Sequence, residues 1–200
     1  RFGHIGDAGK SPWDGLTARA RQIEESKPVR PTCTVAITRD IGEGVVRVTT
    51  SDDPVVRVRV KATVGAEQAE AAQDLADQVK LQLDSPPSME RVDIKVTGPS
   101  PQEKTKIAIK LDYEVTVPAG ANVICKNEWG DTEISGVTGS VEIDSRFGAI
   151  DLRNIGGPVR ARAWGEFPLR ASQLRQGGTF ELQGTQGEFA NVSGALKISN

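Results

Sequence analysis

The second half of the chain repeats a pattern of about eighteen residues, and this repeat limits the fold more than any other feature. Its segments begin at Gly120, Gly139, Gly157, Gly178 and Gly194, the last two being looser copies. Each segment holds two short runs in which apolar and polar residues alternate. One segment cannot bury its own apolar face, so several must stack to share a core. The sequence therefore predicts a β-solenoid, or single-stranded β-helix, over residues 119–200.

The alternation also predicts which side chains face the core, since successive residues of a strand point to opposite faces. Before the central glycine of each segment, the expected inward residues are Val123, Cys125, Val141, Ile143, Val159, Ala161, Phe180, Leu182, Leu196 and Ile198. After that glycine they are Ile134, Val137, Ile150, Leu152, Ile155, Phe167, Leu169, Leu174, Phe189 and Val192.

The outward positions carry charges that alternate in sign between neighbouring segments. One expected row is Ile124, Glu142, Arg160, Glu181 and Lys197, and the next is Lys126, Asp144, Arg162, Gln183 and Ser199. Opposite charges on adjacent strands stabilise a sheet by about 0.2–1 kcal/mol per pair. They also favour one strand register over another, which is a structural use of charge.

An aromatic residue followed by glycine marks the middle of the first three segments: Trp129, Phe147 and Trp164. Because their places are equivalent, we expect the three side chains to form a column on one edge. Two interpretations stay open. The rings could stack and cover the corner, a structural role. They could instead form an exposed strip that binds sugar rings or a partner protein. The charged residues beside this surface are Lys126, Glu128, Arg146 and Glu166.

The first half of the chain has a different pattern. Residues 1–31 are rich in glycine and proline and are expected to be a tail or linker, with a short helix allowed over Thr17–Ser26. Residues 32–118 alternate with a period of two, which indicates a β-rich segment continuous with the solenoid. Within it, residues 66–83 have an apolar stripe at helical spacing and are expected to form one helix. The predicted fold class is all-β, mainly β with one helix.

Together these features resemble a known family. A β-rich segment, one helix, a long strand that ends in Val117-Pro118-Ala119-Gly120, and repeated G-x-V-x-I and G-x-I-x-L runs are similar to the bacterial "putative adhesin" family, a toast-rack-like single-stranded β-helix of unknown function. The resemblance covers residues 33–200 and is most specific over Tyr113–Ile155. It implies a cell-envelope location, periplasmic or extracellular, and supplies no catalytic residues. Bulky Trp129, Phe147 and Trp164 depart from the family pattern, where small polar residues are commoner.

The residue types argue against several kinds of chemistry. The net charge of −2 gives no basic excess for nucleic-acid binding. The single histidine, His4, lies in the expected tail, where it cannot be held as a general base. One histidine and two cysteines are too few for a zinc cluster, and no catalytic, cofactor or metal site is expected. Cys33 and Cys125 are interpreted as buried hydrophobic residues, with a disulfide as the alternative in an exported protein.

We therefore expect a non-enzymatic domain of the bacterial envelope that serves adhesion, scaffolding or signalling through a protein or glycan partner on the solenoid surface. The alternative is a polysaccharide-processing enzyme on a β-helix, which would need a cleft of convergent carboxylates. No segment approaches the ~20 apolar residues that span a membrane, so any anchor would lie in flanking sequence. The run before Asn200 has no cap, so the chain is expected to continue or its edge to pair with another chain.

Overall fold

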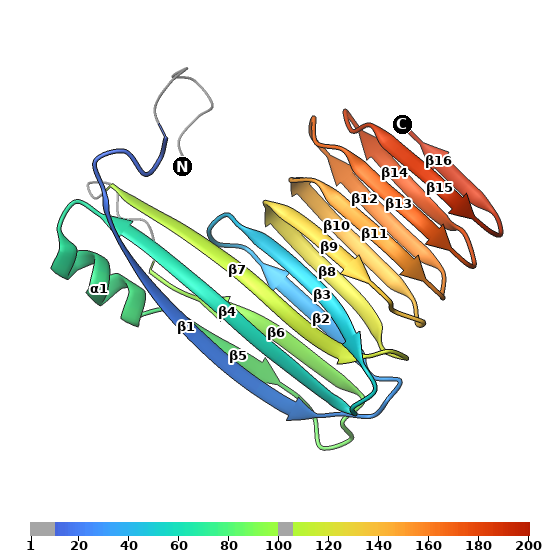
Figure 1. Cartoon of the computed structure of the whole chain (residues 1–200), viewed down its shortest axis with the longest axis horizontal. Helices are drawn as coiled ribbons and strands as arrows, with labels where there is room; N and C mark the ends of the chain where they lie inside the picture. Colours follow the sequence, from blue (N-terminus) through green and yellow to red (C-terminus); the bar gives the residue numbers. More distant parts are fainter. Residues whose placement is uncertain (1–10, 100–105) are drawn as a thin grey trace.

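The computed structural model describes residues 11–99 and 106–200, which form an all-β architecture with a single helix, α1 (Ala69–Asp77). Two eight-stranded sheets face each other (Figure 1). In spatial order, the first sheet contains β1 (Thr17–Pro28), β4 (Val55–Ala66), β7 (Ile107–Pro118), β3 (Val45–Ser51), β9 (Asp131–Ser135), β11 (Ile150–Ile155), β13 (Leu169–Leu174) and β15 (Gly187–Val192). The second contains β16 (Leu196–Ser199), β14 (Gly178–Gln183), β12 (Val159–Trp164), β10 (Val141–Phe147), β8 (Asn122–Trp129), β2 (Thr34–Arg39), β6 (Arg91–Thr97) and β5 (Lys80–Asp84).

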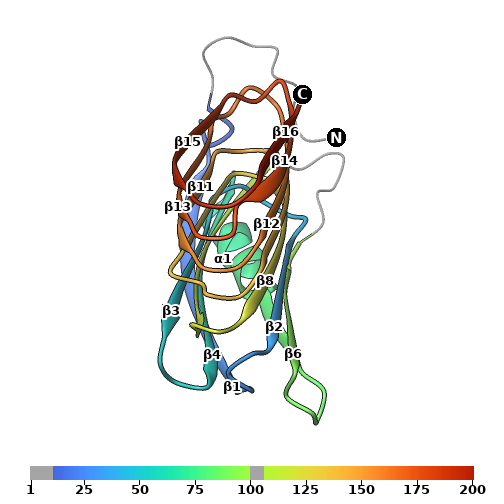
Figure 2. The ribbon, with the colours of Figure 1, turned by 90° about the vertical axis from the view of Figure 1, so that its right-hand side faces the viewer.

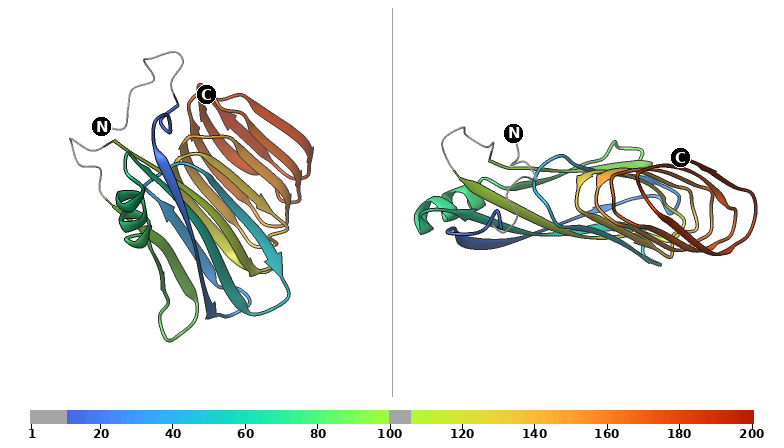
Figure 3. Two further views of the ribbon diagram at one scale, coloured as in Figure 1. Left: turned by 60° about the vertical axis from the view of Figure 1, so that its left-hand side comes forward. Right: turned by 90° about the horizontal axis from the view of Figure 1, so that it is seen from above.

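From β8 onward the chain passes to the opposite sheet after every strand. Each strand pairs in parallel with the equivalent strand of the next segment, so that Val141 lies between Val123 and Val159. The strands β2 and β3 extend the same arrangement backwards, because β2 pairs with β8 and β3 pairs with β9. Seen from above, the successive strand pairs follow one another along the long axis of the molecule (Figure 3).

The core lies between the two sheets and follows the alternation predicted from the sequence. The expected inward residues are buried from Val123 through Leu182, apart from Phe167. In β15 the expected inward residues Phe189 and Val192 are partly buried and pack against the core, but in β16 the prediction is wrong: Leu196 is 38% exposed and Ile198 is 50% exposed. The reason is that β15 and β16 are edge strands, with no strand beyond them among the described residues.

Replacing Ile143 with alanine tests this inward register. Ile143 is almost completely buried, between Cys125 and Ala161 of the neighbouring strands. Its loss removes buried methyl and methylene groups and leaves a cavity, so the free energy of unfolding should fall by about 2–4 kcal/mol. Urea unfolding measures this change. A fall of less than about half a kcal/mol would contradict the assignment of Ile143 to the core.

Two predictions for the first half of the chain are wrong. Residues Thr17–Pro28 were expected in a tail, with a short helix allowed, but they form β1, which pairs antiparallel with β4 along its whole length. The expected helix over residues 66–83 is limited to Ala69–Asp77, and Lys80–Asp84 forms β5 instead. Leu83 fits both the helical stripe that includes Val79 and a strand alternation with Leu81, and pairing with β6 decides in favour of the strand.

The helix α1 lies between the two sheets at the end opposite to β15 and β16 (Figure 2). Its Ala72 and Ala76 are fully buried. Arg21 of β1 donates a hydrogen bond to the carbonyl of Asp77 at 3.0 Å, which ties the end of the helix to the first sheet. This end of the core is therefore covered by a helix whose apolar stripe faces the sheets.

The outer faces of both sheets carry ordered charges. On the second sheet the predicted rows need a correction at β14, because Thr179 lies beside Arg160 and Glu181 lies beside Arg162. Glu181 contacts both arginines, at 3.6 Å and 3.0 Å. On the first sheet one row crosses all eight strands as Glu24, Arg59, Glu114, Arg47, Glu133, Asp151, Arg170 and Glu188. Exposed pairs stabilise little each, but such rows disfavour a shifted register.

Candidate binding surface at the aromatic rim

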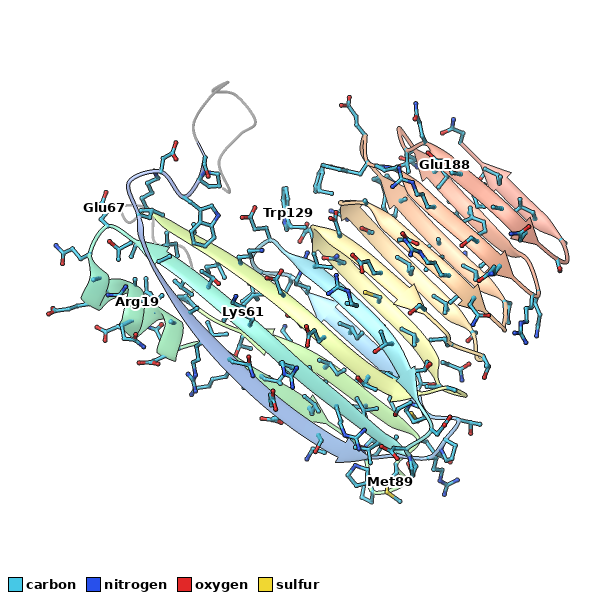
Figure 4. The ribbon with its side chains drawn as sticks, viewed as in Figure 1. Arg19, Lys61, Glu67, Met89, Trp129 and Glu188 are labelled. Atoms are coloured by element: carbon cyan, nitrogen blue, oxygen red, sulfur yellow. The ribbon has the colours of Figure 1, made fainter. Side chains whose placement is uncertain are left out.

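Two of the three predicted aromatic residues form a pair at one rim of the sheets. Trp129 ends β8 and Phe147 ends β10, and the two residues are register partners. Their rings are stacked, with centroids 4.4 Å apart and planes at 18°. Trp129 projects beyond the ends of the strands (Figure 4). The expected column is thus present for these two residues.

Trp164 does not join this stack. In β12, Val159, Ala161 and Ala163 are buried, and Ala163 is the partner of Ser145. Trp164 therefore follows at the level of Arg146, not of Phe147, and the alternation turns it to the outer face of the second sheet. The prediction of one column from Trp129 to Trp164 is wrong, because the seventeen-residue spacing between Gly148 and Gly165 shifts the aromatic position by one residue.

Phe167 takes the place that Trp164 was expected to fill. A Cβ atom added to Gly165 would lie 3.8 Å from Cδ1 of Phe147 and 3.6 Å from Cδ2 of Phe167, so both rings border the same glycine. Phe147 is 39% exposed and Phe167 is 45% exposed. Phe167 was predicted to face the core, but it lies in the turn before β13, outside the strand alternation. We call Trp129, Phe147 and Phe167 the aromatic rim.

Of the charges predicted beside this surface, Glu128 and Arg146 form an ion pair. The distance between their side chains is 3.5 Å, and both side chains are substantially exposed. An exposed pair of this kind contributes little to stability. The alternation turns both side chains to the outer face of the second sheet, so this pair does not lie with the stacked rings of Trp129 and Phe147.

A pocket of about 240 Å³ adjoins the rim at Trp129. We call it the rim pocket, and its lining residues are Pro12, Gly42, Glu43, Ile107, Ala108, Ile109 and Trp129. Two backbone hydrogen bonds fix its walls: Glu43 donates to the carbonyl of Ile109 at 3.0 Å, and Leu111 donates to the carbonyl of Glu43 at 2.7 Å. The indole nitrogen of Trp13 donates to Oε1 of Glu43 at 2.9 Å, which orients the carboxylate.

A buried polar cluster lies beneath the rim. Arg39, at the end of β2, is only 2% exposed. Its Nε donates to Oδ1 of Asn127 at 2.9 Å, and its Nη1 donates to the carbonyl of Leu111 at 3.2 Å. In turn, Nδ2 of Asn127 donates to the carbonyl of Gly130 at 2.8 Å and to Oγ1 of Thr132 at 2.9 Å. Burial lowers the pKa of Arg39, partly offset by nearby acidic groups.

This cluster fixes the turn that carries Trp129. Gly130 has a φ of +102°, a conformation that favours glycine. A Cβ atom at Gly130 would lie 2.2 Å from the carbonyl oxygen of Gly44 and 2.4 Å from Nη2 of Arg39, so no side chain fits there. The position of the aromatic rim is therefore set by a rigid interior. Neither Arg39 nor Asn127 was predicted from the sequence to belong to a site.

Both cysteines are buried and free. They are small core residues, as the first interpretation of the sequence proposed, and they are not joined to each other. Burial raises the pKa of the Cys125 thiol to about 12 and also raises the pKa of Cys33. Both thiols are thus protonated and poorly reactive near neutral pH.

The raised pKa of Cys125 predicts a loss of stability in alkali. The ordinary value is 9.0, so above about pH 9 the unfolded chain releases a proton that the folded chain keeps. This contribution is fully present below that pH and is lost as the pH rises toward about 12. Urea unfolding at several pH values should show a smaller alkaline loss for Cys125→Val than for the wild type. The same dependence of the free energy of unfolding on pH in both proteins would contradict the prediction.

The described residues offer little else for chemistry. Within residues 11–99 and 106–200, no group of three or more histidine, cysteine or acidic side chains could hold a metal ion. Many of the outward acids contact arginines, as Glu133 does with Arg47 at 2.8 Å. His4 lies outside the described residues. In the same ranges, no helix is long and apolar enough to cross a membrane.

Comparisons with known proteins give distant structural similarity. No family model matches the sequence, and no curated protein matches it. The chain is similar to a solved structure described as a "putative cell adhesion protein" from Clostridium sporogenes, at 9% identity and a TM-score of 0.29, covering 90% of this chain and 99% of that chain. A "putative adhesin" from Bacteroides fragilis follows at 11% identity and a TM-score of 0.28, covering 89% and 97%. Another from Parabacteroides distasonis has 11% identity and a TM-score of 0.28, covering 90% and 96%.

Proposed function

We propose that this chain is a non-enzymatic binding domain of the bacterial cell envelope, with an adhesin-like role, and that its aromatic rim contacts a glycan or protein partner. The observation that carries the proposal is the exposure of Phe147 and Phe167 next to the stacked Trp129. An aromatic stack that served only to cover a corner would bury its rings. Exposed apolar side chains that gather in one place favour an interaction site.

We further propose that residues 122–199 are a β-solenoid. Support comes from strands that alternate between the two sheets and pair in parallel with their equivalents in the next segment. Parallel strands lie about 4.8 Å apart. An architecture of this kind repeats the same side-chain position at that interval, which suits a rim that contacts several units of an extended ligand at once.

Single alanine variants of the rim test the proposal. Phe167→Ala should leave the melting temperature within about 2 °C of the wild type, because the side chain is largely exposed. It should also weaken binding to bacterial or host cell surfaces, or to an immobilised glycan panel, by about tenfold or more. Trp164→Ala is the matched control, since Trp164 lies off the rim and should retain binding.

Two outcomes would contradict the proposal. Folded Phe147→Ala and Phe167→Ala variants that bind every surface as well as the wild type would show that the rim has only a structural role. Turnover of a polysaccharide, if it disappeared when outward acids such as Glu142 or Asp144 were changed to amides, would establish the enzymatic alternative.

A further inference from the structure

The rim pocket differs from the rest of the surface in its lining. Its floor consists of Ala108 and Ile109, which are 7% and 8% exposed, and Trp129 supplies an aromatic wall. Among the described residues that line the pocket, Glu43 has the one ionisable side chain. The volume of about 240 Å³ is below the ~300–1,000 Å³ of sites for drug-sized ligands, so the pocket suits a single ring.

The pocket is also preformed. Gly42 has a φ of +68°, and a Cβ atom there would lie 3.0 Å from both the side chain and the carbonyl oxygen of Ile109. The turn that carries Glu43 is thus packed directly on β7. Because Trp13 occupies Oε1 of Glu43, the carboxylate is oriented, and in the described ranges its Oε2 makes no hydrogen bond. A fixed acceptor therefore remains for a ligand that enters.

We propose that the rim pocket binds one neutral sugar ring, the terminal unit of a glycan; this rests on the proposed function. The apolar face of a pyranose packs against Trp129 and Ile109, and one of its hydroxyl groups donates to Oε2 of Glu43. Trp129 belongs to both the pocket and the rim, so further units of the glycan extend along Phe147 and Phe167.

The lining favours a sugar over the main competing ligand, an organic cation. Ammonium groups are recognised by cages of several aromatic rings, whereas Trp129 is the one aromatic residue among the described residues of this lining. The Glu43 side chain is exposed, and an ion pair at such a site contributes little. A sugar ring has both a hydroxyl group that donates to the carboxylate of Glu43 and a flat apolar face that packs against the apolar walls.

Saturation-transfer NMR and tryptophan fluorescence with methyl glycosides of neutral hexoses test this proposal, with choline and n-propylammonium as cationic probes. Ala108→Leu fills the pocket and should weaken glycoside binding by at least about tenfold. Glu43→Gln keeps the shape but replaces the charged acceptor, and should weaken binding by about two- to tenfold. Trp164→Ala, off the rim and outside the pocket, should leave single-ring binding unchanged. Melting temperatures establish that each variant is folded, and exposed Glu43→Gln provides a test if Ala108→Leu does not fold.

Three results would overturn the proposal. One is binding of the ammonium probes in place of the glycosides. Another is glycoside binding that Phe167→Ala removes and both pocket variants retain. The third is no binding of any neutral glycoside to the wild type. None of these three results tests the proposed function, which is tested separately by the binding of the rim variants to cell surfaces.

Discussion

Replacing Phe180 with alanine should lower the free energy of unfolding by about 3–5 kcal/mol, the largest effect we expect from one apolar substitution here. Phe180 is fully buried in β14 and meets Phe189 of β15 edge to face, with ring centroids 4.7 Å apart. Its register partner on the preceding strand is Ala161, and that of Phe189 is Ala171. The two phenyl rings fill the space that these alanines leave, and the partner of Phe180 on the other side, Ile198, is itself half exposed on edge strand β16.

Urea unfolding of Phe180→Ala measures this effect, and Phe167→Ala is the matched control. The same atoms are removed in both variants, but Phe167 is 45% exposed and its loss should change stability by no more than about 0.5 kcal/mol. A loss below about 1 kcal/mol for Phe180→Ala would show that the end of the core relaxes to fill the space. Because Phe180 lies next to edge strand β16, its substitution also tests how well ordered the core is at this end of the sheets.

The stacked half of the fold could be predicted from the sequence because its signals agree with one another. The alternation of Val141 and Ile143 recurs in Val159 and Ala161, and glycines separate the runs. The structure buries these residues on the neighbouring strands β10 and β12, as expected. The register at β14 was wrong because Gly178 pairs with Val159, which moves Glu181 beside Arg162. An insertion before Gly178 changes the spacing between the repeated segments, so the register of β14 against β12 can be assigned only from the pairing of the two strands.

The first half was less predictable because long-range pairing there overrides local preference. Strand β1 consists largely of polar residues, and its weak local signal allowed a helix. Its conformation depends on β4, whose paired residues lie 27 to 49 positions away along the chain, and all twelve residues of β1 pair with it. Its side chains opposite buried Val64, Ala62 and Val58 are Arg19, Arg21 and Glu25. Charges that point inward protect an edge strand from further pairing, and they hide its strand pattern in the sequence.

The candidate site was predicted in part. Trp129 and Phe147 stack, but counting from glycine to glycine placed Trp164 with them. The alternation of Val159, Ala161 and Ala163 already turns Trp164 outward, so that signal was present in the sequence. A similar signal existed for Arg39, because it continues the inward series Val35 and Ile37. A charged side chain at an inward position is easily assigned to a turn, since charges are almost never fully buried without partners.

Replacing Asn127 with alanine should lower the free energy of unfolding by about 3 kcal/mol or more. The amide of Asn127 accepts from Arg39 and donates to the carbonyl of Gly130 and the hydroxyl of Thr132. Alanine would leave Nε of a buried guanidinium and a carbonyl oxygen without partners. An unpaired buried polar group is expensive, and more so when it is charged. Asn127→Ala should therefore be far more damaging than the loss of one neutral hydrogen bond.

The matched control is Asn122→Ala in the same strand. Oδ1 of Asn122 accepts from the backbone and hydroxyl of Ser140, each at 2.9 Å, in a partly buried place with no charged group. Asn122→Ala should therefore lower the free energy of unfolding by about 1 kcal/mol. Asn127→Ala should also weaken the near-ultraviolet circular dichroism of the stacked Trp129 and Phe147, because Asn127 holds the turn that follows Trp129; Asn122→Ala should not. Equal destabilisation by the two variants, with the aromatic signal intact, would show that Arg39 finds another acceptor and that the rim does not depend on the buried cluster.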